Sequence, residues 1–109
     1  MATNYKVLGQ IVPNAASAST AYTVPASTQA VISTITACNQ GSGSTNIRIA
    51  IRPDAATLDP KHYIIYDVTL AAGQTSAFTI GVTADASDVI TVYSSAASCS
   101  FNVFGSEIS

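Results

Sequence analysis

The chain has 109 residues, of which 9% are charged, and its net charge is −2. An average soluble domain carries about 25% charged residues, and the length suits one domain that spans residues 1–109. With only four basic residues the chain lacks the cations that phosphate binding needs, so we expect no nucleic-acid partner. Polar residues break every apolar run before the roughly 18 residues of a membrane span, so we expect no membrane partner.

The polar surface must be built largely from hydroxyl groups, because Ala, Ser and Thr supply 45 of the 109 residues. Hydroxyl groups cost less to dehydrate than charged groups, and a net charge near zero promotes association. The composition therefore predicts faces that a partner covers. The alternative is a monomer with a neutral surface.

Strand-forming residues dominate the apolar part of the sequence. Ile and Val number 20 against three Leu, and β-branched side chains pack well on pleated surfaces. Turn-forming stretches such as "QGSGS" and "ADAS" separate eight strand candidates. In chain order these are 5–12, 20–24, 29–39, 46–52, 62–70, 75–82, 88–94 and 99–105. The spacing predicts an all-β fold: a single antiparallel β-sandwich, jelly-roll or immunoglobulin-like, with about eight strands.

Alternation within three of these segments predicts which side chains face the core. In 46–52 we expect three Ile inward and two Arg outward: Ile47, Ile49 and Ile51 against Arg48 and Arg52. In 62–70 alternate positions should share one face: Ile64, Tyr66, Val68 and Leu70. In 99–105 one face should hold Cys99, Phe101 and Val103, with Phe104 opposite.

The two cysteines, Cys38 and Cys99, end two of the predicted strands. They are too few for a zinc framework. No apolar leader is visible at the N-terminus, which favours a reducing compartment and two free thiols. A disulfide between them is the alternative, and their separation is near that of an immunoglobulin inter-sheet bridge.

Most of the charge lies in one stretch, residues 48–67, "RIAIRPDAATLDPKHYIIYD". If the strands 46–52 and 62–70 form a hairpin, Arg48 and Arg52 approach Tyr63 and Asp67 on one sheet face. The simpler interpretation is a cross-strand ion pair or stack. The alternative is a subunit interface, since Arg and Tyr are enriched at interface hot spots. The candidate interface residues are Arg48, Arg52, Lys61, His62, Tyr63 and Asp67.

No catalytic or metal-binding set emerges from the sequence. His62 is the only His, so it lacks the companions that a metal site needs. No Ser lies in a G-x-S-x-G elbow, and Glu107 is the only Glu. Asp85 and Asp88 in "DASD" fit a plain turn, with a calcium site as the alternative. We therefore expect a protein that is not an enzyme and that holds no cofactor or metal.

A series of short stretches resembles a known family. They are "YKVLGQIVP", "YTVP", "STITACNQ", "RIAIRP", "KHYIIYD" and "FTIGVTADASDVITVYSSAASCSFNVFGSEI", and together they cover nearly all of the chain. In this order they resemble a family of short virion structural proteins of tailed bacteriophages, as found among cyanophages. The resemblance implies a virion component assembled in the host cytoplasm, and it brings no catalytic residues with it.

The expected function is therefore a structural virion protein that self-associates and docks on the particle, as a capsid decoration (cement) protein or a tail or fibre component. Its partners would be copies of itself and other virion proteins, such as the major capsid or tail protein. One alternative is a receptor- or carbohydrate-binding β-sandwich that uses the loop 53–61 and its neighbouring Tyr residues. Another is an immunoglobulin-like adhesion module with the cysteine bridge.

Overall fold

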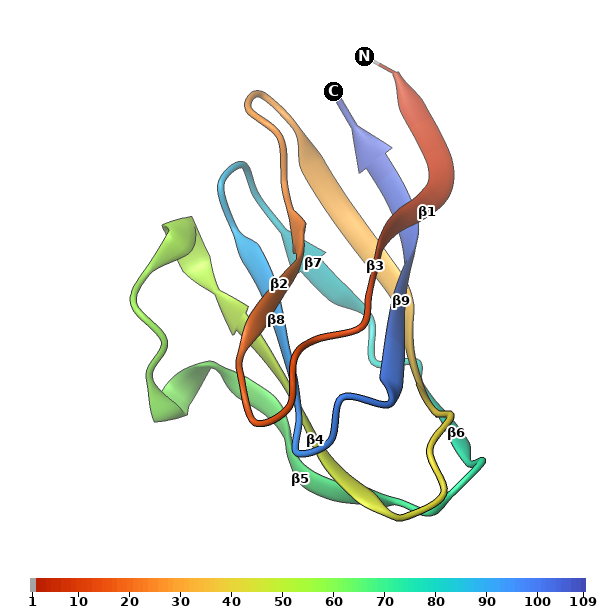
Figure 1. Cartoon of the computed structure of the whole chain (residues 1–109). Coiled ribbons are helices and arrows are strands. Elements are labelled where there is room, and N and C mark those ends of the chain that lie inside the picture. The colour runs from red at the N-terminus through yellow and green to blue at the C-terminus, as the bar shows by residue number, and fades with distance from the viewer. Residues whose placement is uncertain (1) are drawn as a thin grey trace.

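The computed structural model describes residues 2–109, which fold into nine strands and two short 3-10 turns (Figure 1). The elements are β1 (Thr3–Ile11), β2 (Ser19–Thr23), β3 (Gln29–Asn39), β4 (Thr45–Arg52), η1 (Pro53–Ala55), η2 (Pro60–His62), β5 (Tyr63–Leu70), β6 (Thr75–Phe78), β7 (Val82–Ala84), β8 (Val89–Ser94) and β9 (Cys99–Ile108). Every predicted segment contains strand, although 75–82 divides into two strands, and the fold is all-β as predicted.

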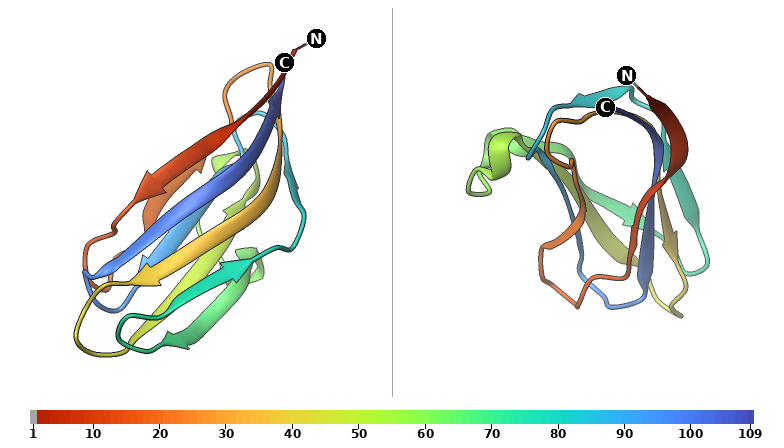
Figure 2. Two further views of the ribbon diagram at one scale, coloured as in Figure 1. Left: turned by 90° about the vertical axis from the view of Figure 1, so that its right-hand side faces the viewer. Right: turned by 90° about the horizontal axis from the view of Figure 1, so that it is seen from above.

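Two antiparallel sheets pack against each other (Figure 2). Sheet A has the order β1-β9-β3-β6, with β7 also paired to β3, and sheet B has the order β2-β8-β4-β5. The pairs are nested: β4 with β5, β3 with β6 and β7, β2 with β8, and β1 with β9. This is one long antiparallel hairpin rolled up so that β9 also meets β3 and β8 also meets β4. Such rolling gives the jelly roll among the predicted sandwich types.

The predicted strand 75–82 is in fact two strands, β6 and β7. Both pair with β3, and Gly81, with a left-handed φ of +64, lies in the unpaired stretch that separates them. β3 shifts its register against β9 between Ile32 and Thr34, opposite the same interruption. The break therefore belongs to a bulged region that crosses sheet A, and the bulge increases the local twist of the sheet.

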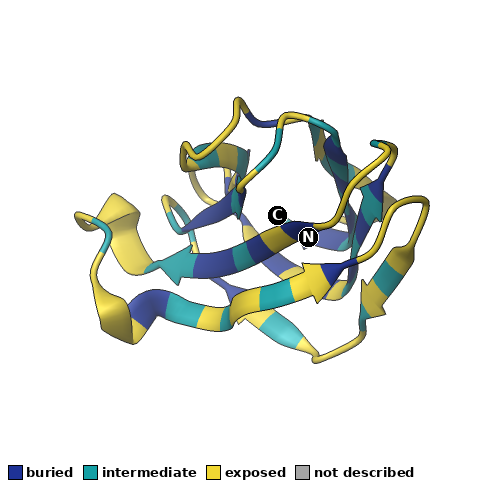
Figure 3. Cartoon of the chain, turned by 60° about the horizontal axis from the view of Figure 1, so that its bottom comes forward, coloured by how far each residue is buried: buried dark blue, intermediate teal, exposed yellow. Residues whose placement is uncertain are grey.

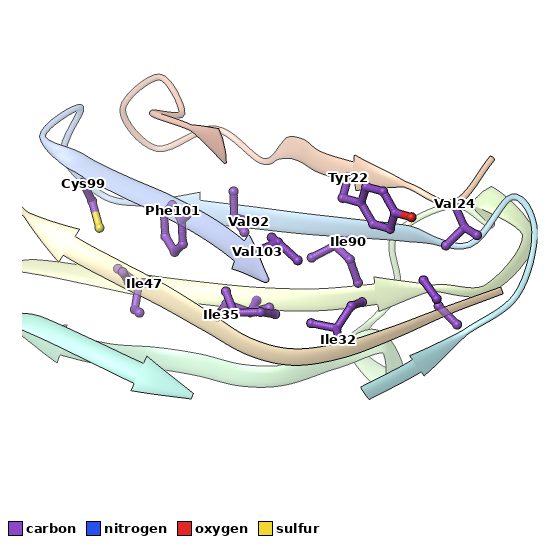
Figure 4. Close-up of a cluster of buried hydrophobic side chains, with 14 of the residues drawn as sticks. Tyr22, Val24, Ile32, Ile35, Ile47, Ile90, Val92, Cys99, Phe101 and Val103 are labelled. Carbon is purple, nitrogen blue, oxygen red and sulfur yellow. The ribbon is translucent and has the colours of Figure 1, made fainter. Parts of the chain in front are cut away.

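The core fills the space between the sheets, where side chains from both point toward one another (Figure 4). Its largest fully buried members include Phe101, Ile32, Ile35, Ile47 and Ile90. Figure 3 shows buried and exposed residues alternating along the strands. The predicted facing of the last strand is confirmed, because Cys99, Phe101 and Val103 are buried whereas Phe104 is only partly buried.

The predicted facing of residues 62–70 is wrong for half of its members. Arg48 lies opposite two residues of β5, because Ile47 pairs with Val68 while Ile49 pairs with Ile65. Asp67 has φ +52 at this bulge. Because of the extra residue, the side chains that precede the bulge face the opposite side of the sheet from the predicted one. Val68 and Leu70 face the core as predicted, but Ile65 takes the inward place and Ile64 and Tyr66 are exposed, by 40% and 58%.

The two thiols are free and lie on opposite faces of sheet A. Cys99 pairs with the buried Asn39, whereas Cys38 pairs with Ser100 on the outer face. Both cysteines belong to neighbouring strands of one sheet, so they do not form an inter-sheet bridge of the immunoglobulin kind. Burial raises the pKa of the Cys99 thiol to about 11.

Asn39 closes one end of the sandwich. Its side chain is fully buried and makes five hydrogen bonds with three loops. The amide nitrogen donates to the carbonyl oxygens of Gly43, Leu70 and Ala71, and the amide oxygen accepts from Gly41 N–H and Ser98 Oγ. One polar side chain therefore satisfies backbone groups that the loops cannot pair among themselves.

Candidate functional site

The charged stretch forms its predicted cross-strand pair on the outer face of sheet B. Arg48 Nε donates to Asp67 Oδ1 at 2.6 Å and Arg48 Nη2 donates to Asp67 Oδ2 at 3.3 Å. The guanidinium carbon lies 4.4 Å from the ring centre of Tyr66 and 4.3 Å from that of Tyr93. The bond to Asp67 raises the pKa of Arg48. Because β4 lies between β5 and β8, one cation binds three strands together.

Arg52 and His62 serve the loop that joins β4 to β5. Arg52 Nε donates to Thr91 Oγ1 at 3.0 Å, and Arg52 Nη1 donates to the carbonyl oxygen of Ala56 at 2.9 Å. The buried His62 accepts the Asp59 N–H on Nδ1 at 3.0 Å, which caps η2. Both side chains therefore hold the loop 53–61 in place.

Lys61 and Tyr63 complete the predicted set at the open edge of sheet B. Lys61 is exposed and Tyr63 is partly buried. The rings of Tyr63 and Tyr66 meet edge to face with centres 5.0 Å apart, and Pro60 joins them around a shallow hollow of about 400 Å³. The structure thus brings Arg48 and Asp67 together and Tyr63 close to them through Tyr66. The interface role of all six residues stays a prediction.

A second polar cluster links the two sheets, and the sequence analysis did not identify it. Tyr22 of β2 donates from its hydroxyl to Glu107 Oε2 of β9 at 2.5 Å, and Lys6 Nζ of β1 lies 2.8 Å from Glu107 Oε1. The bonds from Lys6 and Tyr22 lower the pKa of Glu107. Burial, and then the bond to Glu107, raises the pKa of Tyr22. The carboxylate is therefore held ionised between the sheets.

The outer face of sheet A carries no charged side chain within residues 2–109. Lys6 and Glu107 are the charged residues of its strands. Both occupy positions that alternate with those of the outer face, and their side chains pair with each other. Five apolar side chains lie on it: Tyr5, Val7, Val31, Phe104 and Ile108. The remaining positions are small or amide-bearing: Thr3, Gln10, Gln29, Ser33, Thr34, Thr36, Cys38, Thr75, Ala77, Thr83, Ser100, Asn102 and Ser106.

The stretch "DASD" forms a turn that its own side chain closes. Asp88 accepts the Asp85 N–H on Oδ2 and the Asp54 N–H on Oδ1, each at 2.8 Å. Among residues 2–109 no group of three or more His, Cys, Asp or Glu side chains is placed to hold a metal ion. In the same range no helix has the length and apolar character to cross a membrane.

Comparison with known proteins finds no match for the chain, either among protein-family models or among curated proteins.

Proposed function

We propose that this protein is a non-enzymatic structural component of a bacteriophage virion, which self-associates and docks on the particle as capsid decoration or as a tail or fibre component. The observation that carries the proposal is the uncharged outer face of sheet A, with Tyr5, Val7 and Val31 exposed on it. Contiguous exposed apolar side chains rimmed by polar ones are typical of surfaces that bind other proteins.

The energetics of this face suit a covered surface. Hydroxyl and amide groups lose less on leaving water than charged groups do, and each Å² of apolar surface removed from water contributes about 25 cal/mol. On a particle the same contact is repeated over many copies, so a modest contact area is enough to hold each subunit.

The virion setting is supported by the stretches that resemble short virion structural proteins, from "YKVLGQIVP" to the closing "FNVFGSEI". Two free thiols fit assembly in a host cytoplasm, where thiols stay reduced. The partners proposed are copies of the chain and the major capsid or tail protein. Lys61, Tyr63 and Asp67 would set the orientation of the docked subunit from the rim of sheet B.

The test is particle composition. Particles purified on a density gradient from a lysate that expresses the gene should contain peptides of this chain by mass spectrometry, co-banding with the major capsid protein. Immunogold labelling then separates shell from tail. Peptides found only in the soluble fraction, with unlabelled particles, contradict the virion assignment.

A second candidate function is recognition of a glycan or receptor at the hollow between Pro60, Tyr63 and Tyr66. Two aromatic rings that meet edge to face beside Arg48 and Asp67 offer apolar faces and polar groups in one place. A glycan array probed with the isolated domain should then give signals that Tyr63→Ala abolishes. A blank array excludes glycan recognition.

A further inference from the structure

A projecting side chain and a hollow lie beside each other on the outer face of sheet A. Tyr5 on β1 is 85% exposed, the largest exposure of the large apolar side chains within the described chain. Tyr5 forms part of the wall of a shallow hollow of about 400 Å³, whose lining also includes Lys6, Val31, Phe104, Gly105 and Ser106. Tyr5, Ser106 and Val31 form one cross-strand row. Ser106 lies between the two larger side chains, and its small side chain leaves the space of the hollow open.

Gly105 contributes to the shape of this hollow. A Cβ at this position would lie 2.1 Å from the carbonyl oxygen of Val31 and 2.9 Å from the Cα of Ile32. No other residue type allows β9 and β3 to approach so closely here. Gly105 therefore fixes the spacing of β9 and β3 beside the hollow, and the hollow is present in the chain without a partner.

We propose that a second copy of this chain covers the outer face of sheet A about a two-fold axis, with Tyr5 of each copy seated in the hollow of the other. The inference rests on the self-association in the proposed function and names its surface. In a two-fold interface the same patch faces itself, so a patch must carry both the projecting group and its receptor. Tyr5 and the adjoining hollow meet that condition.

The charges favour a copy of the same chain over a charged partner. Facing copies bring like side chains together, which is costly when those side chains are charged. The one charged residue that lines the hollow is Lys6, and its charge is already paired with Glu107 at 2.8 Å. Two net-negative chains can therefore meet here without placing like charges in contact.

The area is sufficient for a concentration-dependent dimer. Four strands about 4.8 Å apart and about 30 Å long cover about 570 Å² of each copy, or about 1,100 Å² in the pair. The buried area of the pair exceeds the roughly 1,000 Å² expected of a specific interface and lies at the low end of the observed range. Tyr5 would be its central anchor, as buried Tyr side chains commonly are.

Sedimentation velocity over a concentration series tests the proposal with three variants. Tyr5→Ala removes the projecting group at a site exposed enough to leave the fold unchanged. Val31→Glu places a charge beside the hollow, and Ile64→Glu is its matched control, since Val31 and Ile64 are both 40% exposed but lie on opposite sheets. Circular dichroism and the melting temperature check that each variant is folded.

The wild type and Ile64→Glu should dimerise with the same Kd, whereas Tyr5→Ala should raise Kd at least about tenfold and Val31→Glu should be monomeric. If Val31→Glu does not fold, Tyr5→Ala alone decides. A wild-type dimer that Tyr5→Ala and folded Val31→Glu leave intact overturns the inference but keeps self-association. A wild type that stays monomeric throughout overturns both, and particle composition still decides the virion assignment.

Discussion

The hydrogen bond between Tyr22 and Glu107 gives a sharp prediction for stability. Both residues are almost fully buried, with exposures of 7% and 8%, and the bond of 2.5 Å joins the two sheets. A hydrogen bond to a charged group contributes about 1.5–3 kcal/mol. Tyr22→Phe keeps the ring and removes only the hydroxyl, so it should lower the free energy of unfolding by about 2 kcal/mol.

Urea denaturation followed by circular dichroism measures this loss, and the melting temperature should fall by about 10 °C for a domain of this size. Tyr66→Phe is the matched control, because the Tyr66 side chain is 58% exposed, and its stability should equal that of the wild type. A Tyr22→Phe variant within about 0.5 kcal/mol of the wild type would refute the reasoning.

The same cluster predicts how stability depends on pH. Lys6 and Tyr22 lower the pKa of Glu107 below its ordinary value of 4.5. A carboxyl group whose pKa is lower in the folded state stabilises the fold above its unfolded pKa, and this contribution is lost as the pH falls through the folded pKa. Glu107→Gln should therefore flatten the decline of stability below about pH 4.5. An unchanged acid profile contradicts this role.

Three further predictions concern the rest of the fold. Asn39→Ala should lower the free energy of unfolding by about 3 kcal/mol, since it leaves several buried loop groups unpaired; a loss under about 1 kcal/mol in urea denaturation would count against the account of that residue. At pH 8 a thiol reagent should label only Cys38 in the folded protein and both thiols after denaturation, because Cys99 is buried with a pKa of about 11; rapid double labelling is the contrary result. Gly105→Ala should cost about 1–3 kcal/mol from overpacking, whereas Gly43→Ala, with open space around its Cβ position, should be near neutral in the same assay.

The strands could be predicted from the sequence because β-branched residues and turn stretches are local signals. The break at Gly81 and the bulge at Asp67 could not, because each depends on a partner strand. The bulge reverses the facing of Ile64 and Tyr66, so a strict two-residue period fails there. Bulges of this kind carry little local signature beyond a positive φ, and Asp at such a position is permitted without being diagnostic.

The candidate site was only partly accessible from the sequence. Arg48 and Asp67 could be paired because one hairpin joins them. The link between Tyr22 and Glu107 spans 85 residues and depends on the nested strand order. One signal did exist, since Glu107 continues the alternation of the buried Phe101 and Val103, which places a carboxylate in phase with the core. The composition predicted a surface to be covered, but strand register was needed to locate it on sheet A.

The dependence of self-association on salt tests the central claim most directly. Contacts between exposed charges weaken as ionic strength rises, whereas apolar and hydroxyl contacts do not. The dimer Kd of the wild type, measured by sedimentation from about 50 mM to about 500 mM NaCl, should stay constant or fall if the uncharged outer face of sheet A is the covered surface. A Kd that rises about tenfold over this range would move the contact to the charged residues of sheet B and contradict the account.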